Sequence, residues 1–358
     1  MDSAEVVHRF HFAFTATFHY LFPQLTMGLA LLIVLLKARG LRSADAHYDR
    51  AARFWAGLFA LGFLMGVATG IPLEVQFGTS WAAFSKTAGA VVGQPLALEG
   101  VFAFFLESTF LGLFLFGERR ISRRAHFLVA VLLLVGTWLS AYFVVAANAF
   151  MQHPVGYEQA ADGTLRLTSL WALLSNPWAV WEFLHAIVGA VVTGSFAMAG
   201  IGALYLLRRR HERHGRTFVR LGVLAGLPAA LLLAWPTGDY QAKNVVEHQP
   251  EALAAMEGLF ETGPNAPLVL IGQPDMERRR LDNPIAVPGV LSFLTYRRFG
   301  AEVKGLDAFP KDRVPGNIPL LYYSYHLMVG LGTLFIALLL LAAWRLRRGK
   351  LFESRRVL

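Results

Sequence analysis

The stretch LEGVFAFFLESTFLGLFLFG, residues 98–117, decides the fold. It is 20 residues long, and Glu99 and Glu107 carry its only charges. About 20 mostly apolar residues suffice for an α-helix to cross the hydrocarbon core of a bilayer. Ionised groups are costly there and usually face a bundle interior or a polar pathway. The stretch therefore predicts a membrane helix with two functional acids.

The whole chain has the composition of a membrane protein. Of its 358 residues, 55% are apolar and 16% charged, with a mean hydropathy of +0.47. An average soluble domain has about 25% charged residues. The chain has no cysteine, which excludes disulfides, thiolate metal sites and iron–sulfur clusters. The net charge of +9 comes from basic residues that flank apolar runs, which argues for cytoplasmic membrane edges and against nucleic-acid binding.

Seven apolar segments are long enough to span a membrane as helices. They cover residues 10–36, 54–73, 96–117, 127–148, 181–207, 218–236 and 318–344. The first is too long for a signal-peptide core and lacks a small-residue cleavage site, so we expect no removable signal peptide. The predicted fold is an all-α, polytopic membrane helix bundle, with residues 1–236 as a six-helix portion, 237–317 as a long loop and 318–358 as a last helix with a basic tail.

The charges of the loops predict the orientation. Basic residues cluster after the first, third, fifth and seventh spans, as in RRRHERHGR (208–216) and RLRRGK (345–350). The positive-inside rule then places the N-terminus outside and the C-terminus in the cytoplasm, with the loop 237–317 outside. A loop of this length is often functional. Its Pro and Gly content predicts irregular structure with one short helix near PEALAAMEGLFE (250–261).

Histidine and methionine side chains inside the spans are candidate ligands. His11 and His19 lie in the first span and His185 in the fifth. Imidazole is a common axial ligand of haem iron, but an interhelical hydrogen bond explains a membrane histidine equally well. The small residues that follow His185 fit close helix packing or, less commonly, a flat macrocycle. Met328 is ordinary apolar filling unless a His on another helix pairs with it at a haem; His326, two residues earlier, cannot face the same iron from a regular helix.

The two acids of residues 98–117 suit a proton path. Eight residues of α-helix separate them by about 12 Å along the axis and by about 80° in azimuth, on neighbouring faces. Buried carboxyl groups can take up and release protons near neutrality. Ser108 and Ser140 could extend a hydrogen-bonded chain. Structural hydrogen-bonded acids, or one ligand and one counter-charge, are the alternatives.

The outside loop contains candidate contacts for a quinol head group. Residues 236–262 alternate polar and acidic residues with small apolar ones. Glu257 and Asp239 could accept hydrogen bonds from a quinol, and Lys243 lies in the same segment. Any surface helix has a similar pattern, so this pattern alone is weak evidence for a quinol site.

Several long segments together resemble subunit I of the cytochrome bd quinol oxidase family. The resemblance spans nearly the whole chain and keeps the family's order. It is carried by HRFHFAFTATFHYLFPQLTMGLALL (8–32), FLMGVATGIPLEVQFGTSW (63–81), GQPLALEGVFAFFLESTFLGLFLFG (93–117), SAYFVVAANAFMQHPVGY (140–157), QAKNVVEHQPEALAAMEG (241–258) and NIPLLYYSYHLMVGLG (317–332).

The resemblance implies roles for the candidate residues. His19 matches the axial ligand of a high-spin haem, b or d, and His185 and Met328 match the axial pair of the low-spin haem b. Glu99 and Glu107 match acids on the proton route to oxygen, with Glu99 also a candidate iron ligand, and Ser108 and Ser140 match polar members of that route. Glu257 matches the quinol-interacting acid. The family is a multi-pass protein of the bacterial or archaeal cytoplasmic membrane, and it implies a partner subunit II, with a second subunit-I-like chain or small single-helix subunits as further candidates.

The chain departs from the family pattern in three respects. A lysine five residues before the quinol acid is Ala252 here. An arginine two residues before the methionine ligand is His326, which steadies a haem electrostatically only when protonated and could compete as a ligand. The chain also ends after its seventh span, where the family continues with about two helices and a glutamate ligand for a second high-spin haem. We therefore expect an incomplete haem set, completed by another polypeptide, or fewer haems.

Three functions compete on these grounds. The first is a quinol oxidase subunit that oxidises quinol at the outer face and reduces oxygen to water with cytoplasmic protons. The second is a diverged b-type cytochrome that relays electrons from quinol to a partner without reducing oxygen. The third is a haem-free transporter that uses the buried acids for ion coupling.

Overall fold

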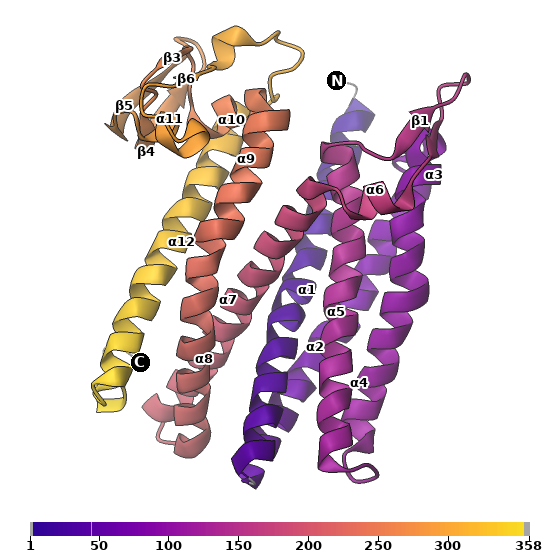
Figure 1. Cartoon of the computed structure of the whole chain (residues 1–358), viewed down its shortest axis with the longest axis vertical. Coiled ribbons are helices and arrows are strands. Elements are labelled where there is room, and N and C mark those ends of the chain that lie inside the picture. Colours follow the sequence, from indigo (N-terminus) through magenta and orange to yellow (C-terminus); the bar gives the residue numbers. More distant parts are fainter. Residues whose placement is uncertain (1–2, 44, 354–358) are drawn as a thin grey trace. The chain divides into compact units, whose positions relative to one another are not determined.

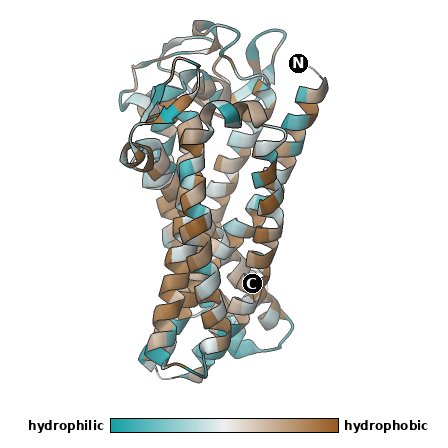
Figure 2. Ribbon diagram, turned by 90° about the vertical axis from the view of Figure 1, so that its right-hand side faces the viewer, coloured by the Kyte–Doolittle hydropathy of each residue, from teal (hydrophilic) through white to brown (hydrophobic). Residues whose placement is uncertain are grey.

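The computed structural model describes residues 3–43 and 45–353. In this part of the chain, seven helical segments are long and apolar enough to cross a membrane. The prediction of an all-α polytopic bundle with seven spans is confirmed. Figure 2 shows apolar residues along the helices and polar residues at their ends and in the loops.

The seven spans are built from the following helices (Figure 1). They are α1 (Ser3–Ser43); α2 (Ala46–Gly78); α3 (Ala82–Leu98) continued by the π-helix η1 (Glu99–Phe104) and α4 (Phe105–Gly117); α5 (Arg123–Gln152); α6 (Leu170–Leu174) followed by α7 (Pro177–Leu207); α8 (Glu212–Leu232) continued by the π-helix η2 (Leu233–Gly238) and α9 (Asp239–His248); and α12 (Ile318–Arg347).

Most of these helices are longer than the apolar runs that predict them, because polar caps start them outside those runs. Asp45 caps α2 by accepting from the His47 amide at 2.9 Å. Ser122 caps α5 and Asn176 caps α7 in the same way. A cap of this kind satisfies one of the amides that the first turn of a helix leaves unpaired.

The remaining elements are short. They are α10 (Pro250–Glu257), α11 (Val290–Tyr296), the 3₁₀ turns η3 (Leu306–Ala308) and η4 (Leu351–Glu353), and the strands β1 (Tyr157–Gln159), β2 (Leu165–Leu167), β3 (Gly263–Pro264), β4 (Leu268–Asp275), β5 (Arg280–Val287) and β6 (Glu302–Val303). The strands form three antiparallel pairs, β1–β2, β3–β6 and β4–β5.

The stretch 237–317 is more regular than its Pro and Gly content predicts. The expected helix near residue 250 is present as α10. The preceding helix continues through η2 and α9 to His248, although Trp235 is extended (φ −148°, ψ 129°) and the Trp235–Pro236 bond is cis. The expectation of otherwise irregular structure was wrong for residues 268–287, because β4 and β5 pair as a hairpin.

The chain divides into two compact units. The first unit comprises residues 1–230 and 339–358, and the second comprises residues 231–338. His19, Glu99, Glu107 and His185 belong to the first unit. Glu257 and Met328 belong to the second.

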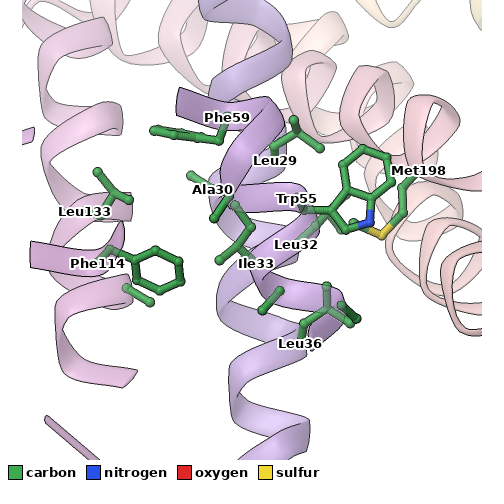
Figure 3. Close-up of a cluster of buried hydrophobic side chains, with 14 of the residues drawn as sticks. Leu29, Ala30, Leu32, Ile33, Leu36, Trp55, Phe59, Phe114, Leu133 and Met198 are labelled. Carbon is green, nitrogen blue, oxygen red and sulfur yellow. The ribbon is translucent and has the colours of Figure 1, made fainter. Parts of the chain in front are cut away.

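The core of the first unit forms around α1 (Figure 3). Leu29, Leu32 and Leu36 of α1 are at most 1% exposed and pack with Trp55 and Phe59 of α2. Residues of α4, α5, α7 and α8 complete the same cluster, namely Leu111, Phe114, Val129, Ala130, Leu133, Met198 and Phe218. Between membrane helices such a cluster is stabilised by van der Waals packing.

A buried ion network joins α1 to its neighbours at one end of the first unit. The side chain of Lys37 is only 4% exposed, and its ammonium lies 2.7 Å from Asp49 and 3.5 Å from Glu118. Arg123 contacts the other oxygen of Asp49 at 2.7 Å. A buried charge needs such partners, since an unpaired one is strongly destabilising.

Candidate functional site

His19 on α1 is hydrogen-bonded to Thr69 on α2. Its Nδ1 lies 3.1 Å from the hydroxyl oxygen of Thr69, and that hydroxyl also lies 2.8 Å from the Met65 carbonyl of its own helix. When the hydroxyl donates to Met65, Thr69 accepts from Nδ1–H, and in that tautomer the lone pair is on Nε2. Gly70 permits the approach, because a Cβ there would lie 3.1 Å from Cε1 of His19.

This tautomer is the form that a haem iron ligand requires. A neutral imidazole binds a metal through one nitrogen while the other is usually held by a hydrogen bond. In residues 3–43 and 45–353, no three His, Asp or Glu side chains come together as a metal site. A porphyrin supplies four donors itself, so one or two axial ligands from the protein suffice. The environment of His19 therefore fits a haem.

Glu107 is a buried acid bonded to the neighbouring helix. It is 6% exposed on α4, and Oγ1 of Thr137 on α5 lies 2.8 Å from its Oε1. The same hydroxyl lies 2.9 Å from the Leu133 carbonyl, so one hydrogen serves two acceptors. Gly136 lets the helices approach, since a Cβ there would lie 3.2 Å from Cα of Glu107.

Glu99 is bonded to the same side of α5. It is the first residue of η1, and the Ser140 hydroxyl lies 2.7 Å from its Oε1. Ser140 and Thr137 are three residues apart on α5 and so share one of its faces. Glu99 and Glu107 therefore both bond to α5, and the π-helix η1, with its wider turns, lies between them.

Ser108 has no described contact with either acid. Its hydroxyl donates to the Phe104 carbonyl of its own helix at 2.8 Å. Glu99 is thus hydrogen-bonded to Ser140 and Glu107 to Thr137, whereas Ser108 is hydrogen-bonded to the backbone of its own helix.

Two further membrane acids were missed by the sequence reasoning. Glu182 lies inside the predicted span 181–207, one turn before His185, and its Oε2 is buried without a partner in the described part of the chain. The Trp178 side chain donates to this carboxylate, and Tyr20 interacts with it electrostatically. Glu74 follows the predicted span 54–73 directly and interacts electrostatically with Glu99. Extending the run 54–73 by one helical turn would have found Glu74, whereas Glu182 already lies at the start of its run.

His185 lies on α7 and is half-buried. The small residues after it are used for helix packing. A Cβ on Gly28 of α1 would lie 2.0 Å from the Ala190 carbonyl, and one on Gly194 would lie 2.9 Å from the Gly28 carbonyl carbon. Of the two interpretations of this small face, the structure supports close packing of α7 on α1.

On α12, Met328 and His326 have different surroundings. Met328 is 51% exposed, so it does not fill a packed core. His326 places Nδ1 3.0 Å from the Tyr322 carbonyl and Nε2 3.1 Å from the Val269 carbonyl, and its ring lies tilted against the Tyr322 ring with centroids 4.0 Å apart. Both nitrogens of His326 thus face backbone acceptors, and Met328 is the side chain of this pair that is open to a ligand.

Glu257, the last residue of α10, is a buried acid beside a cavity. It is 3% exposed, and the Tyr325 side chain donates a hydrogen bond to its carboxylate. Burial raises the pKa of Glu257 to about 7, and the bond from Tyr325 opposes part of that rise. The cavity measures about 420 Å³ and is lined on its other side by the β4–β5 hairpin, including Val269 and Leu281. This volume is within the range of small-molecule sites.

Asp239 and Lys243 lie on α9 and pair with each other. Lys243 is 2.8 Å from Asp239, and Arg297 contacts the same carboxylate oxygen. Asp239 is therefore held by two cations, whereas Glu257 is held by a phenol. Ala252, the position that departs from the family lysine, lies on α10.

Comparisons with known proteins identify the family of the chain. The family model described as cytochrome bd terminal oxidase subunit I matches residues 7–357. The chain is 36% identical to the cytochrome bd ubiquinol oxidase subunit 1 of Bacillus subtilis (strain 168), over 98% of this chain and 76% of that protein. It is 37% identical to the cytochrome bd-II ubiquinol oxidase subunit 1 of Escherichia coli (strain K12), over 86% of this chain and 60% of that protein.

A solved structure has the same fold. It is the bd oxidase from Geobacillus thermodenitrificans, with a TM-score of 0.89 and 29% identity, and the match covers 99% of this chain and 83% of that one. The match with the family model covers nearly the whole chain, and so does the one with the Bacillus subtilis relative. The chain therefore belongs to the cytochrome bd terminal oxidase subunit I family.

Proposed function

We propose that this chain is the haem-bearing subunit of a quinol:oxygen oxidoreductase, active within a complex that includes a subunit II. Quinol is oxidised at the outer face, and oxygen is reduced to water with cytoplasmic protons. The N-terminus is outside and the C-terminus in the cytoplasm. The observation that carries the proposal is the contact of Nδ1 of His19 with Thr69 inside an apolar span, which leaves Nε2 as the nitrogen for an iron.

Three side chains would hold the cofactors. His19 would bind the iron of a high-spin haem, b or d, and His185 and Met328 the iron of a low-spin haem b, with Glu99 a further candidate ligand at the high-spin site. Bound haem supplies one-electron transfer and, at the high-spin iron, a place for oxygen to bind. The protein supplies the axial ligands, their orientation and a dry environment.

The acids of the first unit would deliver protons. Glu107 with Thr137, and Glu99 with Ser140, form two hydrogen-bonded pairs along α5. Each pair combines a carboxyl group with a hydroxyl that can turn between acceptors, which is what a proton relay needs. Protonatable pairs of this kind support oxygen reduction over a simple electron relay, since a relay needs no proton supply.

Glu257 would accept a hydrogen bond from quinol. Its cavity has an apolar wall for the ring, and its carboxylate is the one buried acid that lines it. Asp239 and Lys243 support the same region from α9.

Quinol-driven oxygen consumption by the purified complex tests the proposal. We expect the wild-type complex to consume oxygen with a short-chain quinol and the Glu257→Gln complex to lose most of this activity while keeping its haem spectrum. A wild-type complex that oxidises quinol but passes electrons only to an added acceptor would support the electron relay instead. A complex with no haem absorption would support the transporter.

A further inference from the structure

Two buried polar atoms at the Glu257 end of α10 have no hydrogen-bond partner in the described part of the chain. They are Oε2 of Glu257, which lines the cavity, and the hydroxyl of Tyr322 on α12. The two residues are 3% and 1% exposed. Buried polar atoms in proteins are nearly always paired. An unpaired carboxylate oxygen on a residue that lines a cavity therefore indicates a place where a bound molecule completes the hydrogen bonding.

The two atoms belong to one cluster in the second unit. Tyr322 and Tyr325 are three residues apart on α12 and share a face. Tyr322 interacts electrostatically with Glu257, and the Tyr325 hydroxyl donates to the Glu257 carboxylate. Because Oε2 is the oxygen without a partner, the bond from Tyr325 goes to Oε1.

Glycines and a histidine fix Tyr322 in this cluster. A Cβ on Gly258 would lie 2.9 Å from Cε2 of Tyr322, and one on Gly272 would lie 3.0 Å from its hydroxyl oxygen. The His326 ring contacts the Tyr322 ring at a tilt of 31°, with centroids 4.0 Å apart. The ring of Tyr322 is therefore closely packed on several sides.

We propose that Tyr325 is a positioning residue for quinol: it holds Oε1 of Glu257, so that Oε2 is presented to the hydroxyl of the quinol head group. The inference rests on the proposed quinol site and assigns a residue that sets its geometry. A free carboxylate offers two equivalent oxygens and about four acceptor sites. With Oε1 occupied by a phenol, the carboxylate offers one directed acceptor. A quinol hydroxyl is a donor that matches it, and the apolar wall of the cavity suits the ring.

The hydrogen bond from Tyr325 also favours the ionised form of Glu257. A hydrogen bond to a carboxylate stabilises the charge, and here it opposes the effect of burial. In the ionised form both oxygens are acceptors, so Oε1 can accept from Tyr325 while Oε2 accepts from quinol. The other charged and titratable groups around the acid are those of the same helix, of the cavity wall and of α12, namely Glu251, Glu261, Arg279, Arg280, Tyr322 and His326.

Tyr325→Phe in the assembled complex tests the inference. It removes one oxygen atom and keeps the ring. We expect kcat/KM for a ubiquinol or menaquinol with a single isoprene unit to fall roughly tenfold, as for loss of a hydrogen bond to a charged group. We also expect the acid limb of the pH profile to move to higher pH, because Glu257 loses the donor that favours its ionised form. The reduced-minus-oxidised haem spectrum should not change.

Tyr323→Phe is the matched control. It makes the same substitution two residues earlier on the same helix, at a side chain that is 49% exposed, and it should leave both kinetics and pH profile unchanged. The double variant Glu257→Gln with Tyr325→Phe should behave as Glu257→Gln alone, because Tyr325 acts through Glu257.

Three results separate the outcomes. Wild-type kinetics in Tyr325→Phe would overturn the inference, and so would a further loss when Tyr325→Phe is added to Glu257→Gln. Such results, with Glu257→Gln itself impaired, would leave the proposed quinol site intact. Full quinol turnover in Glu257→Gln would overturn the quinol site and this inference together, and would assign water to the unpaired atoms.

Discussion

The hydroxyl oxygen of Thr137 on α5 lies 2.8 Å from Oε1 of Glu107 on α4, inside a membrane span. One turn further along α5, Ser140 makes the equivalent contact with Glu99. Two acids on one helix are thus paired with two hydroxyls on its neighbour. The arrangement leads to the first prediction.

Glu107→Gln should slow oxygen reduction by about 100-fold, the usual size of a lost proton-transfer group. Glutamine fills the same space and can still accept from Thr137, but it cannot carry a proton. Haem content, measured from the absorption spectrum, should stay near normal. Turnover equal to that of the wild type would remove Glu107 from the proton path.

Thr69→Val should change the haem that His19 binds. Valine keeps the shape of threonine but cannot accept from Nδ1–H, so the ring loses the bond that fixes its tautomer and orientation. We expect loss of part of the high-spin haem, or a shift in its reduced-minus-oxidised spectrum and in its iron–histidine stretching frequency. Loss of such outer partners typically lowers metal-site affinity or activity by about 10–100-fold.

Two variants control this test. Thr69→Ser keeps the hydroxyl and should keep the spectrum. Thr87→Val removes a hydroxyl that bonds only within its own helix, to the Ala83 carbonyl at 3.1 Å, and should also have no effect. A Thr69→Val spectrum identical to that of the wild type would show that His19 does not need this bond.

Asp49→Asn should destabilise the first unit. It would leave the buried ammonium of Lys37 with one carboxylate partner, Glu118, at 3.5 Å. Breaking a buried pair costs about 3–5 kcal/mol, and thermal inactivation of the purified complex should move to clearly lower temperature. Glu5→Gln removes one partner of an exposed pair with Arg9 and should change stability little. Equal effects of the two substitutions would contradict the role of the network.

Quinol oxidation should depend on pH through Glu257. Burial raises its pKa to about 7, so the carboxyl group is protonated below that pH and is then a weaker acceptor that cannot take up a proton from quinol. We expect kcat/KM for quinol to rise as the pH increases through about 7, and this limb to be absent in Glu257→Gln. A rise of kcat/KM at the same pH in the wild type and in Glu257→Gln would show that another group titrates.

The fold was predictable because membrane spans depend on length and apolar content alone. The seven runs identify the seven spans, and the apolar run that contains Glu99 and Glu107 identifies the two acids. The bonding of both acids to α5 was not predictable, because it depends on which helix packs beside them and on the π-helix η1 between them. The hairpin β4–β5 was missed because its strands do not alternate cleanly and contain Pro274 and Pro284.

The contacts that distinguish the candidate site residues from one another also cannot be predicted from the sequence. Asp239 and Glu257 look alike as loop acids, but only the structure shows one paired with two cations and the other with a phenol beside a cavity. Glu182 was missed because it sits at the start of its apolar run, where a charge is usually read as a flank. Its buried position becomes visible only when α7 extends a turn further, to Pro177.

The reduced-minus-oxidised spectra of the complexes with His19→Ala and His185→Ala test the central claim most directly. The account predicts that His185→Ala abolishes the low-spin haem signal and keeps the high-spin one, and that His19→Ala does the reverse. Spectra unchanged from the wild type in both variants would contradict it, because no haem would then depend on either histidine.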